Sequence, residues 1–256
     1  MSLREKVSVA QRHQRSVRID ADLGSKASLD GFIFSETSHD VLISMSRHIA
    51  KTEQGAFTWT GPYGCGKSSL VIALSALLSG NRKSRNVAAE KIGEDAATTI
   101  WANMPPNTAG WKILPVVGRR DRPAQVIGEA IFDSGLCTDP CSSWTDKNVV
   151  EELQSIAGNS KKHGGLIVFI DEMGKFLESL AHEGTDIHLF QDLAEMASRS
   201  KGKLIIVGIL HQAFEEYGRK LSREMRDEWS KIQGRFIDLS VNSAGEEQIE
   251  LLSRAI

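Results

Sequence analysis

The chain has 256 residues, of which 41% are hydrophobic and 25% are charged, as is typical of a globular protein large enough to bury a substantial core. Its 31 lysines and arginines against 33 acidic residues leave a net charge of -2, which excludes a uniformly basic surface for nucleic acid. Three cysteines, a small and odd number, argue against a disulfide framework and for a reducing compartment. No apolar run reaches the roughly 18 residues of a membrane helix and no signal peptide is present, so we expect no membrane partner and a cytoplasmic location.

Residues 1–28 are predicted to form a basic N-terminal arm. Its first part carries Arg4, Lys6, Arg12, Arg15 and Arg18 against Glu5 and Asp20. Such an arm could contact a partner or nucleic acid, or it could be a solvated terminus.

Residues 29–242 form the predicted core, in which helices alternate with strands. Ser35 or Thr37 can cap a helix over residues 35–51, and residues 56–60 (AFTWT) are typical of a strand.

An apolar helix is predicted over residues 67–80, closed by Gly80. Residues 81–104 are predicted to be an inserted helical segment. The next strand covers residues 111–118, and its Pro115 cannot donate a ladder hydrogen bond, so we expect it at a sheet edge.

The second half continues the alternation. Strands at 164–171 and 203–210 are apolar enough to be covered on both faces. One charged helix is expected from Phe214 to Trp229. The remaining predicted elements are helices at 122–135, 147–160 and 186–202 and a last strand at 235–241. Strands that alternate with helices predict an α/β fold with a parallel sheet and helices on both faces.

The segment TGPYGCGKSS, residues 60–69, lies between a predicted strand and a predicted helix and fits the phosphate-loop pattern G-x-x-x-x-G-K-[ST]. Its glycines let backbone N–H groups turn toward phosphate oxygens at a helix N-terminus. Lys67 is expected to reach the β- and γ-phosphates, and the Ser68 hydroxyl to coordinate Mg²⁺. The predicted nucleotide-binding residues are Gly61, Pro62, Tyr63, Gly64, Cys65, Gly66, Lys67, Ser68, Ser69 and Gln212.

Each cysteine can have either a structural role or a chemical one. Cys65, inside the phosphate loop, is either a small tolerated side chain or a redox-sensitive one. Cys137 and Cys141 form a C-x3-C without a histidine partner, so two loop or core thiols are favoured over a metal site.

Two adjacent acids follow the strand in LIVFIDE. Asp171 ends the strand, where its carboxylate can hold Mg²⁺ through water, and Glu172 can polarise a water for attack on the γ-phosphate. This pair favours ATP hydrolysis, with ATP and Mg²⁺ as the cofactors.

Other nucleotide-binding classes lack their motifs here. The chain has no N-K-x-D tetrapeptide for guanine, and LLSGNRK lies too close to the phosphate loop to be the L-S-G-G-Q signature of ABC transporters. A small-molecule kinase remains an alternative, but it would not need Glu172.

With GPYGCGKSS, LIVFIDE and LIIVGILHQ together, the chain resembles the additional-strand P-loop ATPases, especially the AAA+ and STAND-like groups. The resemblance implies a P-loop NTPase three-layer sandwich with a mainly parallel five-stranded sheet in the order 5-1-4-3-2. It also implies a polar sensor residue after the fourth strand, at His211 or Gln212, although a polar helix-start residue is the alternative.

In those families an arginine before the last strand reaches the neighbouring subunit's nucleotide. Arg235, in WSKIQGRFIDLSV, matches that position, although a surface arginine is the alternative. The resemblance therefore implies a homo-oligomer as the active unit.

The pattern DEMGKFLE, FQDLAEMASRS and LIIVGILHQAFEEYG is also similar to the ATPase modules of large bacterial anti-phage defence proteins, of the BREX or STAND type. This resemblance implies a larger complex and further domains. We expect residues 243–256 to begin a truncated helical lid domain.

Three functions stay open: an ATP-hydrolysing module, a non-hydrolysing switch or scaffold, and a DNA-associated ATPase of the initiator or translocase kind. The arm and the loop GRRDR, residues 118–122, motivate the last function, but a solvated turn explains that loop equally well.

Overall fold

The computed structural model describes residues 17–24, 29, 33–137, 143–159, 163–183, 187–219 and 221–242. Its centre is a five-stranded sheet with the order β2-β3-β4-β1-β5, and all neighbouring strands are parallel. The strands are β1 (Ala56–Thr60), β2 (Lys112–Val117), β3 (Leu166–Asp171), β4 (Leu204–Leu210) and β5 (Ile237–Ser240). Counted from the other edge, this is the predicted order 5-1-4-3-2, which is confirmed.

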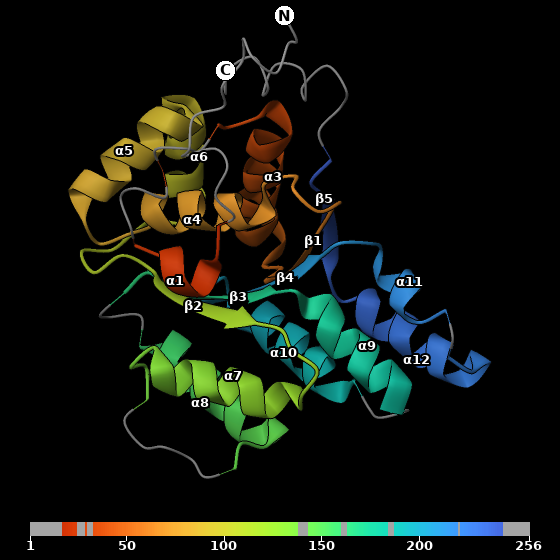
Figure 1. Ribbon diagram of the computed structural model, residues 1–256. Coiled ribbons are helices and arrows are strands. Elements are labelled where there is room, and N and C mark those ends of the chain that lie inside the picture. Colours follow the sequence, from red (N-terminus) through yellow and green to blue (C-terminus); the bar gives the residue numbers. More distant parts are fainter. Residues whose placement is uncertain are drawn as a thin grey trace, which may run out of the picture.

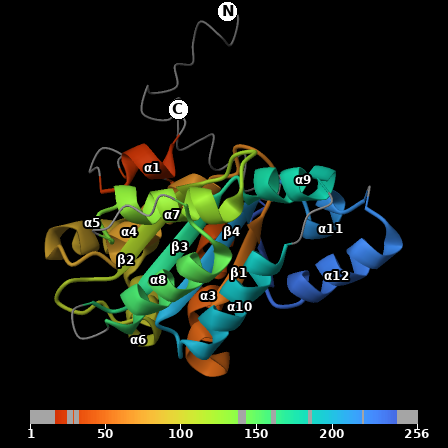
Figure 2. The ribbon, with the colours of Figure 1, turned by 90° about the horizontal axis from the view of Figure 1, so that it is seen from below.

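Helices cover both faces of the sheet (Figures 1 and 2). One layer contains α1 (Ile19–Asp22), α3 (Glu36–Thr52), α4 (Lys67–Leu77), α5 (Arg82–Ile92) and α6 (Glu94–Asn103). The other contains α7 (Pro123–Asp133), α8 (Asp146–Gly158), α9 (Met173–Glu183), α10 (His188–Arg199), α11 (Phe214–Tyr217) and α12 (Arg223–Gln233). The predicted three-layer sandwich is therefore confirmed.

The interior strand β3 shows why the chain folds into layers. Leu166, Val168 and Ile170 pack into the core on the α7–α12 side, whereas Ile167 and Phe169 pack into the core on the α3–α6 side. All five side chains are fully buried. Since each face is covered, the strand carries apolar residues at every position instead of an alternating pattern.

Strand β2 lies at the edge of the described sheet and pairs with β3. Pro115 stands opposite Phe169 in this ladder. A proline is tolerated here because an edge strand has a side that needs no ladder hydrogen bond. The predicted edge position is confirmed.

Two helical predictions need correction. The single charged helix expected after β4 is two helices, because α11 ends at Tyr217 and α12 begins only at Arg223. Ser222 caps the second helix by accepting a hydrogen bond from the backbone N–H of Met225 at 3.3 Å. Helix α9, directly after β3, was not predicted.

Part of the predicted arm belongs to the folded core. Residues 17–24 include α1, which packs against β2 and α4, and Ile19 is fully buried. Residues 1–16, residues 243–256 and Cys141 lie outside the described residues. Among the helices described, none is long and apolar enough to cross a membrane.

Candidate nucleotide-binding site

The phosphate loop joins β1 to α4 at the carboxyl edge of the sheet, where ligands bind in open α/β folds. Gly64 and Gly66 have φ angles of 80° and 87°, a left-handed conformation that favours glycine. At Gly61, an added Cβ would collide with the carbonyl oxygen of Val241. The glycines of the motif are therefore needed for two different reasons, backbone conformation and close approach.

Lys67 begins α4 and is only 5% exposed. Its ammonium donates to the carbonyl oxygens of Gly61 at 2.6 Å and Pro62 at 2.7 Å, and it lies 3.3 Å from the sulfur of Cys65. A buried charge needs such partners. The loop therefore holds the lysine head group beside its own backbone, at the wall of the cleft described below.

Ser68 and Asp171 meet across the cleft. The Ser68 hydroxyl donates to Oδ2 of Asp171 at 3.2 Å, and the backbone N–H of Glu172 donates to Oδ1 at 2.9 Å. Burial raises the pKa of Asp171, and these two hydrogen bonds oppose that shift.

This pair suits a magnesium ion. Both groups offer oxygen atoms, which Mg²⁺ prefers, and a cation would also favour the ionised form of the buried Asp171 carboxylate. The described residues contain no group of three or more His, Cys, Asp and Glu side chains able to hold a metal. An ion here would therefore complete its shell with water and phosphate oxygens, as Mg²⁺ commonly does.

Glu172 lies where β3 gives way to α9 and has a φ of 52°, uncommon for a residue with a side chain. The residue that follows β2, Gly118, packs closely against this turn. Its N–H donates to the carbonyl of Asp171 at 2.7 Å, and a Cβ at Gly118 would collide with the carbonyl oxygen of Glu172. The Glu172 carboxylate forms an ion pair with Lys175, one turn into α9.

His211 follows β4 and stacks on Tyr63, with ring centroids 3.5 Å apart and planes 20° from parallel. Both ring nitrogens are buried and have no hydrogen-bond partner within the described residues. Burial lowers the pKa of His211, and the positive charge of Lys67 lowers it further. The imidazole is therefore held neutral in the neutral pH range.

One cleft of about 760 Å³ is lined by Lys67, Ser68, Asp171, Glu172 and His211. This volume lies in the range of small-molecule sites. The structure thus brings together residues that the sequence separates by more than a hundred positions. Gln212 is exposed and does not line the cleft, so of the two candidate sensor positions only His211 faces it.

Sequence reasoning missed one wall of this cleft. Residues 17–20 line it together with the phosphate loop, and Arg18 and Asp20 form an ion pair there. The segment carries no motif; its apolar residues, the fully buried Ile19 and the partly buried Val17, were the signs of packed positions. Lys175, which pairs with Glu172 but does not line the cleft, was missed as well, because helix α9 was not predicted.

Arg235 lies away from the cleft. It precedes β5, whose first residue pairs with Phe57 near the start of β1, so it lies at the amino edge of the sheet. Its guanidinium forms an ion pair with Glu195 of α10 at 2.9 Å, and its carbonyl accepts from Gln54 at 2.7 Å. Within one chain, Arg235 does not reach the phosphate loop, and its role toward a neighbouring subunit stays a prediction.

No protein-family model and no curated protein matches the chain. Among solved structures, it is similar to the ORC2 protein of Aeropyrum pernix, determined as ADPNP–ADP complexes, with 13% identity and a TM-score of 0.50 over 96% of this chain and 55% of that one. It is also similar to Cdc6p from Pyrobaculum aerophilum, with 13% identity and a TM-score of 0.44 over 86% of this chain and 48% of that one. The chain thus spans about half the length of these structures. At this identity the likeness to ORC2 concerns the fold, and together with the strand order it shows that the chain has the P-loop NTPase fold.

Proposed function

We propose that the chain is an ATP-binding module that hydrolyses ATP with the help of Mg²⁺. The observation that carries this proposal is the meeting of Lys67, Ser68, Asp171 and Glu172 in one cleft of sufficient volume. The positive end of a helix, a buried lysine, two oxygen ligands and a further carboxylate beside them are the parts that phosphoryl transfer to water requires.

Each side chain has a distinct task in this proposal. The first turn of α4 and Lys67 bind the phosphates, while Ser68 and Asp171 hold Mg²⁺, which neutralises charge on the phosphate oxygens. Glu172 takes a proton from water as the water oxygen bonds to the γ-phosphorus and the bond to the bridging oxygen of ADP breaks. The neutral His211 can donate a hydrogen bond to a γ-phosphate oxygen or hold the water.

Two substitutions test binding and hydrolysis separately. Lys67→Ala should weaken Mg·ATP binding, measured by calorimetry, by at least about tenfold, because a hydrogen bond to a charged group is lost. Glu172→Gln should keep binding near the wild-type level and lower kcat by about 10²- to 10⁴-fold. Undiminished turnover in Glu172→Gln would remove Glu172 from the mechanism.

A second candidate is an ATP-dependent switch or scaffold that does not turn over. The observation in its favour is that Lys67 bonds to the loop carbonyls and Glu172 pairs with Lys175, so both reactive groups have partners within the chain. Long-lived nucleotide occupancy with negligible phosphate release would favour this candidate.

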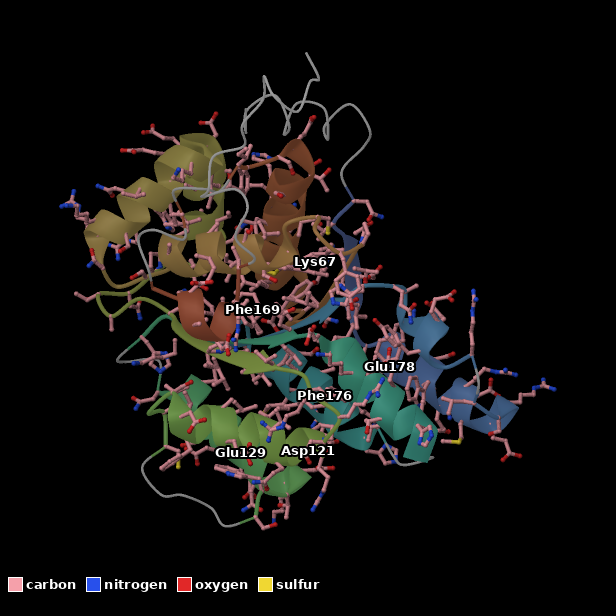
Figure 3. All side chains as sticks on the ribbon, viewed as in Figure 1. Lys67, Asp121, Glu129, Phe169, Phe176 and Glu178 are labelled. Carbon is pink, nitrogen blue, oxygen red and sulfur yellow. The ribbon has the colours of Figure 1, made fainter. Side chains whose placement is uncertain are left out.

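A DNA-associated function draws less support from the described residues. In the loop at 118–122, Arg119 pairs with Asp121 and with Glu129 of α7, and Arg120 pairs with Glu178 of α9 at 3.6 Å. Figure 3 labels the acidic partners around this loop. Charges satisfied in this way contribute less to phosphate binding, so the function would depend on the arm. DNA binding that falls with salt and disappears when residues 1–16 are removed would support it; no binding at low salt would end it.

The wider setting is proposed from resemblance. An oligomer with Arg235 at its subunit boundary, further domains and a role in bacterial anti-phage defence are proposed from the similarity to AAA+ and STAND-like proteins. The cytoplasmic location is proposed from the sequence pattern alone. Sedimentation with and without Mg·ATP tests the oligomer, since a nucleotide-bridged oligomer should form only with nucleotide bound.

A further inference from the structure

Among the described residues, Lys175 bonds to both the side chain and the main chain of Glu172. The Lys175 ammonium forms an ion pair with Oε2 of the carboxylate, and the Lys175 backbone N–H donates to the Glu172 carbonyl at 2.9 Å. Residue 175 therefore holds both the main chain and the side chain of Glu172.

The main chain at Glu172 has little freedom to move. Its left-handed backbone conformation is enclosed by the end of β2, where Gly118 approaches so closely that no side chain would fit. The side-chain torsions are the remaining freedom of Glu172. The contact with Lys175 consequently decides where the carboxylate points.

Lys175 acts within the cleft's own electrostatic environment. Glu172 and Lys175 side chains are 31% and 45% exposed, so neither is locked in the core. Burial and Lys67 lower the pKa of His211 most, Asp171 and Glu172 oppose this shift, and Lys175 lowers the pKa to a smaller extent. The Lys175 charge therefore acts on His211, which lines the cleft.

We propose that Lys175 is a positioning residue that restrains Glu172, so that release of this ion pair limits turnover. The inference rests on the proposed ATP hydrolysis. The Lys175 ammonium occupies Oε2 and holds the carboxylate in one orientation, so Glu172 can turn toward the attacking water only when this ion pair is released. The γ-phosphate of ATP is the anion that competes for the ammonium, because phosphate oxygens are strong acceptors of charge-assisted hydrogen bonds. ADP lacks that group.

Steady-state kinetics of Lys175→Met provide the first test. The variant keeps most of the side-chain length but loses the charge. We therefore expect kcat to rise about two- to fivefold, because loss of a half-exposed ion pair can lower the activation free energy by that much. The KM for ATP should change little. Lys175→Arg, which keeps the charge, should return kcat toward the wild-type value. A merely structural lysine would not give this split between kcat and KM.

A matched control exists on α12. Lys231 pairs with Glu228 at the same three-residue spacing, but Glu228 does not line the cleft, whereas Glu172 does. Lys231→Met should leave kcat unchanged. A kcat in Lys175→Met that is unchanged or lower than in the wild type would overturn the proposal.

A second measurement tests the restraint of Glu172 by Lys175 even if the chain does not hydrolyse ATP. The ¹³C carboxyl signal of Glu172, assigned by its loss in Glu172→Gln, should move in Lys175→Met but not in Lys231→Met. In the wild type, a non-hydrolysable ATP analogue with Mg²⁺ should move it toward the Lys175→Met position, whereas ADP should not. Nucleotide binding without turnover in any variant would refute hydrolysis alone, and a carboxyl signal that does not respond would refute the restraint.

Discussion

At the scale of single residues, the sequence predicts which side chains belong to the site, but it does not predict all the contacts between them. Lys67, Ser68 and Asp171 could be assigned because a phosphate loop and an acid at the end of a buried strand have fixed geometries. The stack of Tyr63 on His211 could not be assigned, since it depends on how the loop and the end of β4 face each other.

The burial of His211 leads to a prediction about pH and stability. Its pKa in the folded chain is lowered, so as pH falls through about 6.5 the unfolded chain takes up the proton first. His211 should therefore contribute a loss of stability that grows below that pH. Urea unfolding at pH 7.5 and 5.5 should show a smaller loss on acidification in His211→Gln than in the wild type. Equal losses in the two proteins would mean that His211 titrates normally.

At the scale of elements, the hydrophobic pattern predicted all five strands, because β1, β3 and β4 are short apolar runs between turns. It missed α9, whose start after Asp171 depends on the left-handed Glu172 and not on a recognisable cap. It also joined α11 to α12, because the buried side chains of both helices, among them Phe214 and Trp229, continue at helical spacing across the break.

The contact between the ends of β2 and β3 is an element-level feature that mutation can probe. Gly118→Ala would force a Cβ against the Glu172 carbonyl, and overpacking of this kind costs about 1–3 kcal/mol of stability. The control is Gly158→Ala at the end of α8, where a Cβ meets nothing within 4 Å and the change should be neutral or slightly stabilising. Urea midpoints of the two variants check the difference; equal midpoints would contradict it.

At the scale of the whole molecule, the sheet separates two sites of interest. The phosphate loop lies at its carboxyl edge, and Arg235 lies at its amino edge, paired with Glu195. The motifs of the sequence predict the strand order, because they resemble those of a class of proteins with a known order. A single sequence does not show which surfaces contact another chain. The oligomeric role of Arg235 accordingly rests on resemblance.

Mixing variants would test that role. Arg235→Ala should bind Mg·ATP like the wild type, because the residue lies far from its own cleft, but should lose turnover if it serves a neighbour. Combining Arg235→Ala with Glu172→Gln should restore part of the activity, since one variant supplies an intact cleft and the other an intact arginine. Full activity of Arg235→Ala alone would show that Arg235 has no role in a neighbouring subunit's site.

The central claim is that the cleft between the phosphate loop and Asp171–Glu172 converts ATP to ADP and phosphate. Its most direct test is a single-turnover measurement in which excess protein is mixed with labelled ATP and Mg²⁺ and the bound nucleotide is identified over time. The wild type should hold ATP that becomes ADP, Glu172→Gln should hold ATP that persists, and Lys67→Ala should hold little of either. Conversion in Glu172→Gln at the wild-type rate, or no nucleotide retained by the wild type, would contradict the account.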